Sequence, residues 1–127
     1  MKTNDVYRCS HCKLQIEVLT GGENMPVPQC CGEPMKLQVP NTVDAAKEKH
    51  VPVIEADGCG TVVKVGSIAH PATPEHFIEW IELVSENRVC RVNLTPQDAP
   101  EAHFSVAYSP ELTARISCNL HGVWQNK

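Results

Sequence analysis

The chain has 127 residues, of which 42% are hydrophobic, and a formal net charge of −4. This length fits one ordinary domain, or one small unit with one modest domain. The negative charge argues against a nucleic-acid groove, which needs a basic face. No run approaches the ~18 apolar residues that a membrane span needs. Because no apolar stretch of the signal-peptide kind follows Lys2, we expect a cytoplasmic protein.

The seven cysteines are unevenly distributed, and four of them fall in the first quarter of the chain. In a chain without a secretion signal, such cysteines indicate metal ligands or redox groups before disulfides. A polar stretch, residues 42–50, then separates this quarter from the rest. We therefore predict two domains, residues 1–37 and 38–127. The first is too small to hold a core of its own, so it needs a metal or disulfides.

The N-terminal cysteines follow the pattern Cys9-Ser-His-Cys12 and then Cys30-Cys31-Gly32. A Cys-x-x-Cys turn brings two sulfurs to one ion. Neighbouring side chains in an extended chain point opposite ways, so the backbone must bend at the second pair, and a glycine favours such a bend. Four thiolates suit zinc or iron in a tetrahedral cage. A structural zinc ribbon and a strained Cys30–Cys31 disulfide remain alternatives, and His11 is interpreted as a surface residue.

The second domain contains short β-rich segments at intervals of roughly ten residues, which favours an antiparallel sandwich. Residues 77–84 alternate apolar and polar side chains, as a half-buried strand does, although glutamate and leucine also favour a helix. The predicted strands cover residues 51–55, 61–68, 77–84, 89–94, 103–109, 112–118 and 122–124.

Several loops of the second domain each carry a possible metal ligand. The segment between His70 and His76 contains two prolines, so it forms an extended loop rather than a helix. Cys118 precedes His121 by three residues. Nitrogen-rich ligation with one thiolate suits iron, copper or zinc, and five protein ligands favour iron. The candidate set is His50, His70, His76, Cys118 and His121.

Three motifs together, EKHVP, HPATPEHFIEWIEL and SCNLHG, with CxxC and CC upstream, resemble the desulfoferrodoxin family of two-iron superoxide reductases. The resemblance implies a mainly β protein, with a small desulforedoxin-like iron domain followed by an immunoglobulin-like antiparallel β-sandwich. It implies one iron held by Cys9, Cys12, Cys30 and Cys31. It implies a second iron held equatorially by His50, His70, His76 and His121, with Cys118 axial and one position open.

The activity that the resemblance implies is one-electron reduction of superoxide to hydrogen peroxide, as a detoxification of superoxide. Lys49 would attract the anion, and Glu48 would occupy the open position of the oxidised iron. A local cation suits an anionic substrate on a net negative protein. The resemblance also implies a homodimer and an electron donor such as rubredoxin, with zinc possible at the four-cysteine site. Cys59 and Cys90 match no ligand position.

Three other functions remain open at this point. The chain would be a structural module, a zinc ribbon followed by a sandwich, if the later histidines were incidental. A superoxide dismutase would both oxidise and reduce its substrate. A one-electron carrier of the rubredoxin type would need only the N-terminal cysteines.

Overall fold

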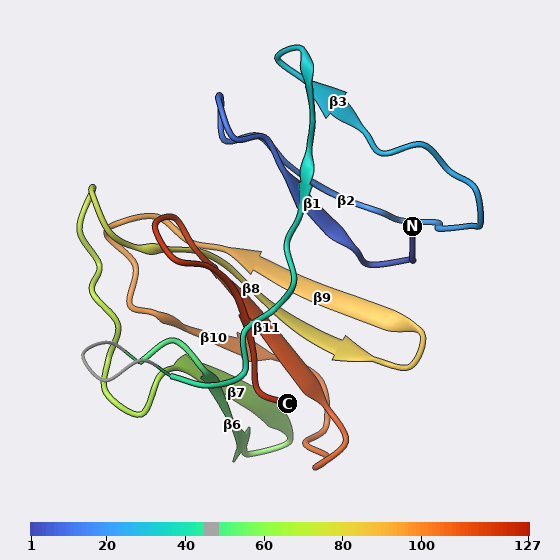
Figure 1. Ribbon diagram of the computed structural model, residues 1–127. Coiled ribbons are helices and arrows are strands. Elements are labelled where there is room, and N and C mark those ends of the chain that lie inside the picture. The colour runs from blue at the N-terminus through green and yellow to red at the C-terminus, as the bar shows by residue number, and fades with distance from the viewer. Residues whose placement is uncertain (45–48) are drawn as a thin grey trace. The chain divides into compact units, whose positions relative to one another are not determined.

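The computed structural model describes residues 1–44 and 49–127. It divides into two compact units, Met1–Val39 and Pro40–Lys127. The regular elements of the described residues are β-strands, coloured along the chain in Figure 1. Nowhere in these residues is there a helix long and apolar enough to cross a membrane. The mainly β class expected from the sequence is confirmed.

The N-terminal unit contains two small antiparallel sheets. In the first, β1 (Val6–Arg8) lies between β2 (Gln15–Glu17) and β5 (Lys36–Leu37). The second is a hairpin of β3 (Gln29–Cys30) and β4 (Glu33–Pro34). Among the described residues, the buried cluster of this unit consists only of Tyr7, Cys9, Val18 and Met35. A core this small supports the expectation that a metal is needed to hold the unit together.

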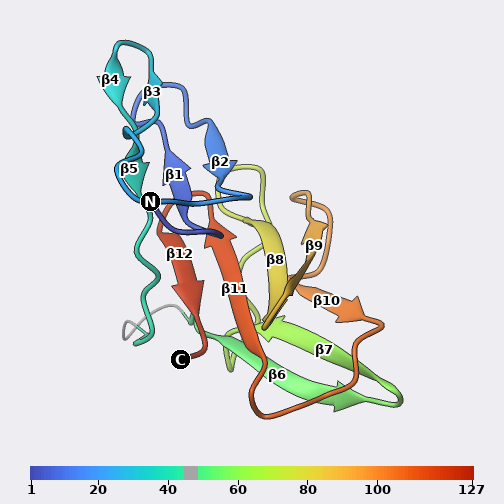
Figure 2. The same ribbon diagram turned by 90° about the vertical axis from the view of Figure 1, so that its right-hand side faces the viewer.

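The C-terminal unit consists of two antiparallel sheets, with strand orders β10-β7-β6 and β12-β11-β8-β9. Figure 2 shows the four-stranded sheet together with β6, β7 and β10. The strands are β6 (Pro52–Asp57), β7 (Gly60–Val65), β8 (Ile78–Ser85), β9 (Arg88–Asn93), β10 (Glu101–Phe104), β11 (Thr113–Cys118) and β12 (Gly122–Gln125).

The hydrophobic core of this unit draws side chains from both sheets. Val63 of β7, Ile81 of β8 and Ile116 of β11 are each fully buried in one cluster. Alternate positions of a strand point to one face, so Leu83 joins Ile81 on the core side. The immunoglobulin-like sandwich predicted from the sequence is confirmed, and its seven strands divide three and four between the sheets.

Two predicted strands end several residues earlier in the structure than the sequence suggested. The strand expected over residues 103–109 ends at Phe104, which pairs with Thr61. Because β7 begins one residue before Thr61, at Gly60, it offers no partners for most of the expected strand. The strand expected over residues 61–68 ends at Val65. Gly66 follows with a φ of 80°, which turns the chain out of the sheet. By contrast, the segment expected as a strand over residues 77–84 is a strand and not a helix, with bounds Ile78–Ser85.

Candidate metal centres

The first candidate centre lies within the N-terminal unit and gathers its four cysteines. Their sulfur atoms all lie within 4.8 Å of one another. Cys12 Sγ is 3.5 Å from Cys30 Sγ, which is 3.9 Å from Cys31 Sγ. A metal with tetrahedral bonds of about 2.3 Å to sulfur holds its sulfurs about 3.8 Å apart. The spacing therefore fits one tetrahedral ion, and it is too long for a Cys30–Cys31 disulfide.

Local backbone geometry explains how adjacent cysteines reach the same point. Cys31 and Gly32 are the two turn residues of the β3–β4 hairpin, and their φ angles are 52° and 77°. Two central residues with positive φ are typical of a type I′ hairpin turn. This is the bend that the Cys-Cys-Gly sequence predicts. The left-handed conformation is unfavourable for a cysteine, so binding of a metal ion by Cys31 helps to offset the backbone strain.

The electrostatics of the four sulfurs also favour a cation. Backbone N–H groups of Cys12 and His11 donate to the sulfur of Cys9 and lower the pKa of Cys9 to about 6. Hydrogen bonds with the sulfurs of Cys12 and Cys9 raise the pKa of Cys30 to about 12. The crowded thiols thus resist ionising together, and a bound metal ion removes that resistance. His11 does not join them, since its Nε2 lies 3.0 Å from Glu33 at the surface.

The second candidate centre lies in the C-terminal unit and combines histidines with one cysteine. Ligand atoms of His50, His76, Cys118 and His121 all lie within 4.8 Å of one another. His121 Nδ1 is 3.2 Å from His50 Nε2 and 3.6 Å from Cys118 Sγ. A metal with bonds of about 2.1 Å to nitrogen holds neighbouring nitrogens about 3.0 to 3.4 Å apart. These distances fit a shared ion.

His70 is not a member of that group of four, but its ring lies beside it. The centroid of the His70 ring is 4.7 Å from that of His50 and 4.5 Å from that of His76. His70 Nδ1 is 2.8 Å from the carbonyl oxygen of Pro71. A carbonyl only accepts hydrogen bonds, so Nδ1 carries the proton and Nε2 keeps its lone pair. That Nε2 atom is buried, so the structure fits His70 as a fifth ligand.

The strands of the sandwich end where these side chains are needed. His50 precedes β6, and its ring stacks on Trp124 of β12 with centroids 4.7 Å apart. Cys118 is the last residue of β11, and the pairing register with β8 shifts between Ser117 and Cys118. A β-bulge of this kind re-aims a side chain. The site is therefore assembled where strands of the sandwich begin or end, from segments far apart in sequence.

Several residues that support these ligands were not found from the sequence. Asp44 Oδ1 accepts hydrogen bonds from the backbone N–H groups of His50 and Val51, at 2.6 and 2.8 Å. Trp124 Nε1 donates to the carbonyl oxygen of His121 at 3.1 Å. An aspartate in a polar stretch gives no sequence signal for such a contact. The Gly-Val-Trp segment so close to His121 was the available hint for Trp124.

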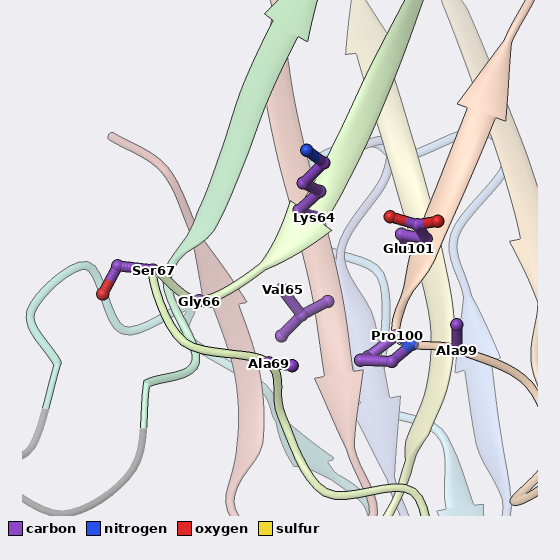
Figure 3. Close-up of a pocket in the computed structure, with 8 residues that line it drawn as sticks. All are labelled: Lys64, Val65, Gly66, Ser67, Ala69, Ala99, Pro100 and Glu101. Atoms are coloured by element: carbon purple, nitrogen blue, oxygen red, sulfur yellow. The ribbon is translucent and has the colours of Figure 1, made fainter.

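Of the two predicted catalytic residues, Lys49 directly precedes His50 and is half-buried, whereas Glu48 lies outside the described residues. Close to Lys49, the loop from Gly66 to Ala69 borders a surface hollow of about 270 Å³, shown in Figure 3. This hollow is lined by small side chains with Lys64 and Glu101 at its side, and no predicted ligand lines it. It is therefore not the centre of the chemistry.

The chain matches two family profiles that together cover almost all of it. Residues 1–38 match the desulfoferrodoxin N-terminal domain, and residues 42–127 match desulfoferrodoxin. This chain belongs to the desulfoferrodoxin family. Within that family, it is 52% identical over 123 residues to desulfoferrodoxin of Syntrophotalea carbinolica, covering 97% of this chain and 95% of the relative.

Two further proteins extend the family comparison toward superoxide reductases. The crystal structure of the superoxide reductase from Treponema pallidum matches with a TM-score of 0.74 and 32% identity, covering 97% of this chain and 96% of that one. The superoxide reductase of Pyrococcus abyssi is 40% identical over 98 residues, which is 63% of this chain and 85% of the relative. The resemblance expected from the motifs is thus confirmed at the level of the family.

Proposed function

We propose that this member of the desulfoferrodoxin family is a superoxide reductase. The reaction combines one superoxide anion, one electron and two protons to give one hydrogen peroxide. The observation that carries the proposal is the convergence of His50, His76, Cys118 and His121, beside His70, on a fold shared with superoxide reductases. The reaction forms no dioxygen, which distinguishes a superoxide reductase from a superoxide dismutase.

The donor set of the second centre supports iron as its metal. Four imidazoles and one thiolate exceed the four ligands that zinc usually takes, and mixed nitrogen and sulfur ligation suits iron. When bound there, a ferrous ion supplies the single electron that the reaction needs. The proposed ligands are His50, His70, His76, Cys118 and His121.

Burial differs among the proposed ligands in a way that leaves room for a small anion. His50, His70 and Cys118 are buried, whereas His76 is half-buried and His121 is exposed. Solvent and substrate therefore reach the centre on the side of His76 and His121. We propose that Lys49, which precedes His50 in the chain, raises the local concentration of superoxide around the centre. The expected role of Glu48, as a ligand of the oxidised metal, stays a prediction.

For the N-terminal unit we propose an iron held by Cys9, Cys12, Cys30 and Cys31, with zinc as the substitute in recombinant protein. The four-sulfur cage and the match to the desulfoferrodoxin N-terminal domain support it. This centre has the donor set of an electron carrier, so we assign it a role in passing electrons onward. A homodimer, a rubredoxin-like donor and a cytoplasmic location, all expected from the sequence, stay predictions.

The stoichiometry of the reaction tests the proposal against dismutation. The iron-loaded protein, given a limiting reductant and a pulse of superoxide, should form one peroxide for each superoxide consumed and release no dioxygen. The consumption should stop when the reductant is exhausted. Release of one dioxygen for every two superoxide ions, without a donor, would instead make the protein a dismutase. An absence of any reaction would leave a metal-binding module.

A further inference from the structure

Asn119 lies between Cys118 and His121, and its side chain reaches the loop that carries His76. Its Nδ2 donates to the carbonyl oxygen of Glu75 at 3.0 Å, and its Oδ1 accepts from the backbone N–H of Phe77 at 3.0 Å. Its own backbone N–H donates to the carbonyl oxygen of Phe77 at 3.2 Å. One side chain thus forms hydrogen bonds with the backbone on both sides of His76.

These hydrogen bonds matter because His76 belongs to a loop and not to a strand. The β8 strand begins only at Ile78. Within its own loop, His76 is held by backbone and side-chain hydrogen bonds with Thr73, at 2.9 to 3.3 Å. Those bonds shape the loop itself, whereas the bonds from Asn119 tie it to the segment that carries Cys118 and His121. The Asn119 bonds therefore help to fix His76 relative to Cys118 and His121, beside the pairing of Ile78 with Cys118.

The amide of asparagine suits this position because it offers a donor and an acceptor together. An aspartate would keep the acceptor for Phe77 but place a second oxygen against the carbonyl of Glu75. An alanine would leave both backbone groups without their side-chain partner.

We propose that Asn119 is a positioning residue that holds His76 in place to bind the metal of the second centre. The proposal rests on the metal site of the proposed function but not on the reaction at that site. Removing a residue that orients a metal ligand typically lowers metal affinity by about 10-fold to 100-fold. We expect a loss in this range for Asn119→Ala, and a similar loss for Asn119→Asp.

The test is a double-mutant cycle between Asn119 and His76, read by metal affinity. Cobalt is titrated into reduced, metal-free, full-length protein in competition with a chelator. The absorption bands that disappear in Cys118→Ser report the second centre alone. Asn119→Ala should weaken cobalt binding in the wild-type background and change their position, but should have almost no further effect in His76→Ala. Asn119→Asp serves in the same cycle if the alanine variant does not fold.

Asn126 provides a matched control in the same unit. Its Oδ1 accepts from the backbone N–H of Ala114 at 2.9 Å, and its Nδ2 donates to the carbonyl oxygen of Leu112 at 3.4 Å. Asn126→Ala therefore removes the same kind of bridge at a different place, and it should leave cobalt affinity unchanged.

The proposal is overturned if Asn119→Ala binds cobalt like the wild type. It is equally overturned if the loss is the same in the presence and absence of His76, or the same in Asn126→Ala. None of these results depends on superoxide. A failure of the proposed reaction would appear in the stoichiometry of the wild-type protein, so the two failures are distinguishable.

Discussion

The two metal centres are assembled from very different lengths of chain. The four-cysteine centre draws all its sulfurs from the first 31 residues, through one Cys-x-x-Cys turn and one hairpin turn. The histidine-rich centre draws its ligands from residues as far apart as His50 and His121. The first is made by local backbone geometry, and the second by the way two sheets pack.

This difference implies opposite relations between folding and metal binding. Among the described residues, the N-terminal unit has a cluster of four buried side chains, whereas the sandwich has a cluster of twelve. A small unit with so little core depends on its metal for the folded state. The sandwich has enough buried apolar surface to fold first and then present its ligands to an ion.

Removal of the metals should give the largest difference between the two units. After chelation under reducing conditions, we expect residues of Met1–Val39 to lose their dispersed amide signals in an NMR spectrum, because their cluster is too small to persist alone. Residues of the sandwich should keep theirs, apart from loops around the histidines. Dispersed signals from the N-terminal unit in metal-free protein would contradict this relation between core size and metal dependence.

Gly66→Ala should damage the scaffold close to the second centre. Gly66 has a φ of 80°, and a Cβ there would lie 2.5 Å from the carbonyl oxygen of Lys49 and 2.7 Å from its Cβ. We expect a loss of about 2–4 kcal/mol in the free energy of unfolding, from backbone strain and overpacking together.

Gly58→Ala is the control for this substitution. Gly58 has a φ of 58° but nothing within 4 Å of an added Cβ, so only backbone strain of about 1–2 kcal/mol is expected. Both values are measured by denaturant unfolding of the sandwich. Equal losses in the two variants would mean that the contact with Lys49 contributes nothing.

Lys49→Ala should affect the encounter with substrate while leaving the metal in place. Removing this cation should lower the second-order rate with superoxide by roughly tenfold at low salt, because the anion is no longer attracted. The difference should shrink at high ionic strength, as screening removes it from the wild type. Pulse radiolysis measures the rate, and Lys64→Ala, which removes a cation paired with Glu55, is the control. An unchanged rate in Lys49→Ala at low salt would refute the role.

His103 should give the smallest effect, because it is an exposed residue of β10 and belongs to neither ligand set. Asp57 Oδ2 lies 2.7 Å from His103 Nδ1 and raises the pKa of His103 above 6.5. Because the folded pKa is the higher one, this pair stabilises the fold fully below the unfolded pKa, and the contribution is lost as pH rises through the folded pKa. An NMR titration should show a lower pKa in Asp57→Asn; an unchanged value would argue against the pair.

The sequence predicted the fold class well because its signals are local. Alternation over residues 77–84 identified a strand where propensity also allowed a helix, and the structure has β8 there. The strand expected to run to residue 109 was wrong beyond Phe104, because its length depends on where the partner strand begins. Pairing partners are not visible in one segment of sequence.

The candidate ligands were found from the sequence for a different reason. Histidines and a cysteine beside loop signals, together with the family motifs, indicated which side chains to consider. The residues that orient them gave no such signal: Asn119 and Asp44 act through backbone hydrogen bonds that exist only in the folded chain. Chemistry-bearing side chains are thus easier to predict than the contacts that aim them.

The visible spectrum of the iron-loaded, oxidised protein tests the central claim most directly. If Cys118 and the four histidines bind one iron, a thiolate-to-iron absorption band should appear in the red on mild oxidation and vanish in Cys118→Ser. The bands of the four-cysteine centre should remain in Cys118→Ser. The iron content of this variant should either fall from two to one per chain or stay at two without the red band. A red band that survives in Cys118→Ser, or a protein that never holds iron outside its N-terminal unit, would contradict the account.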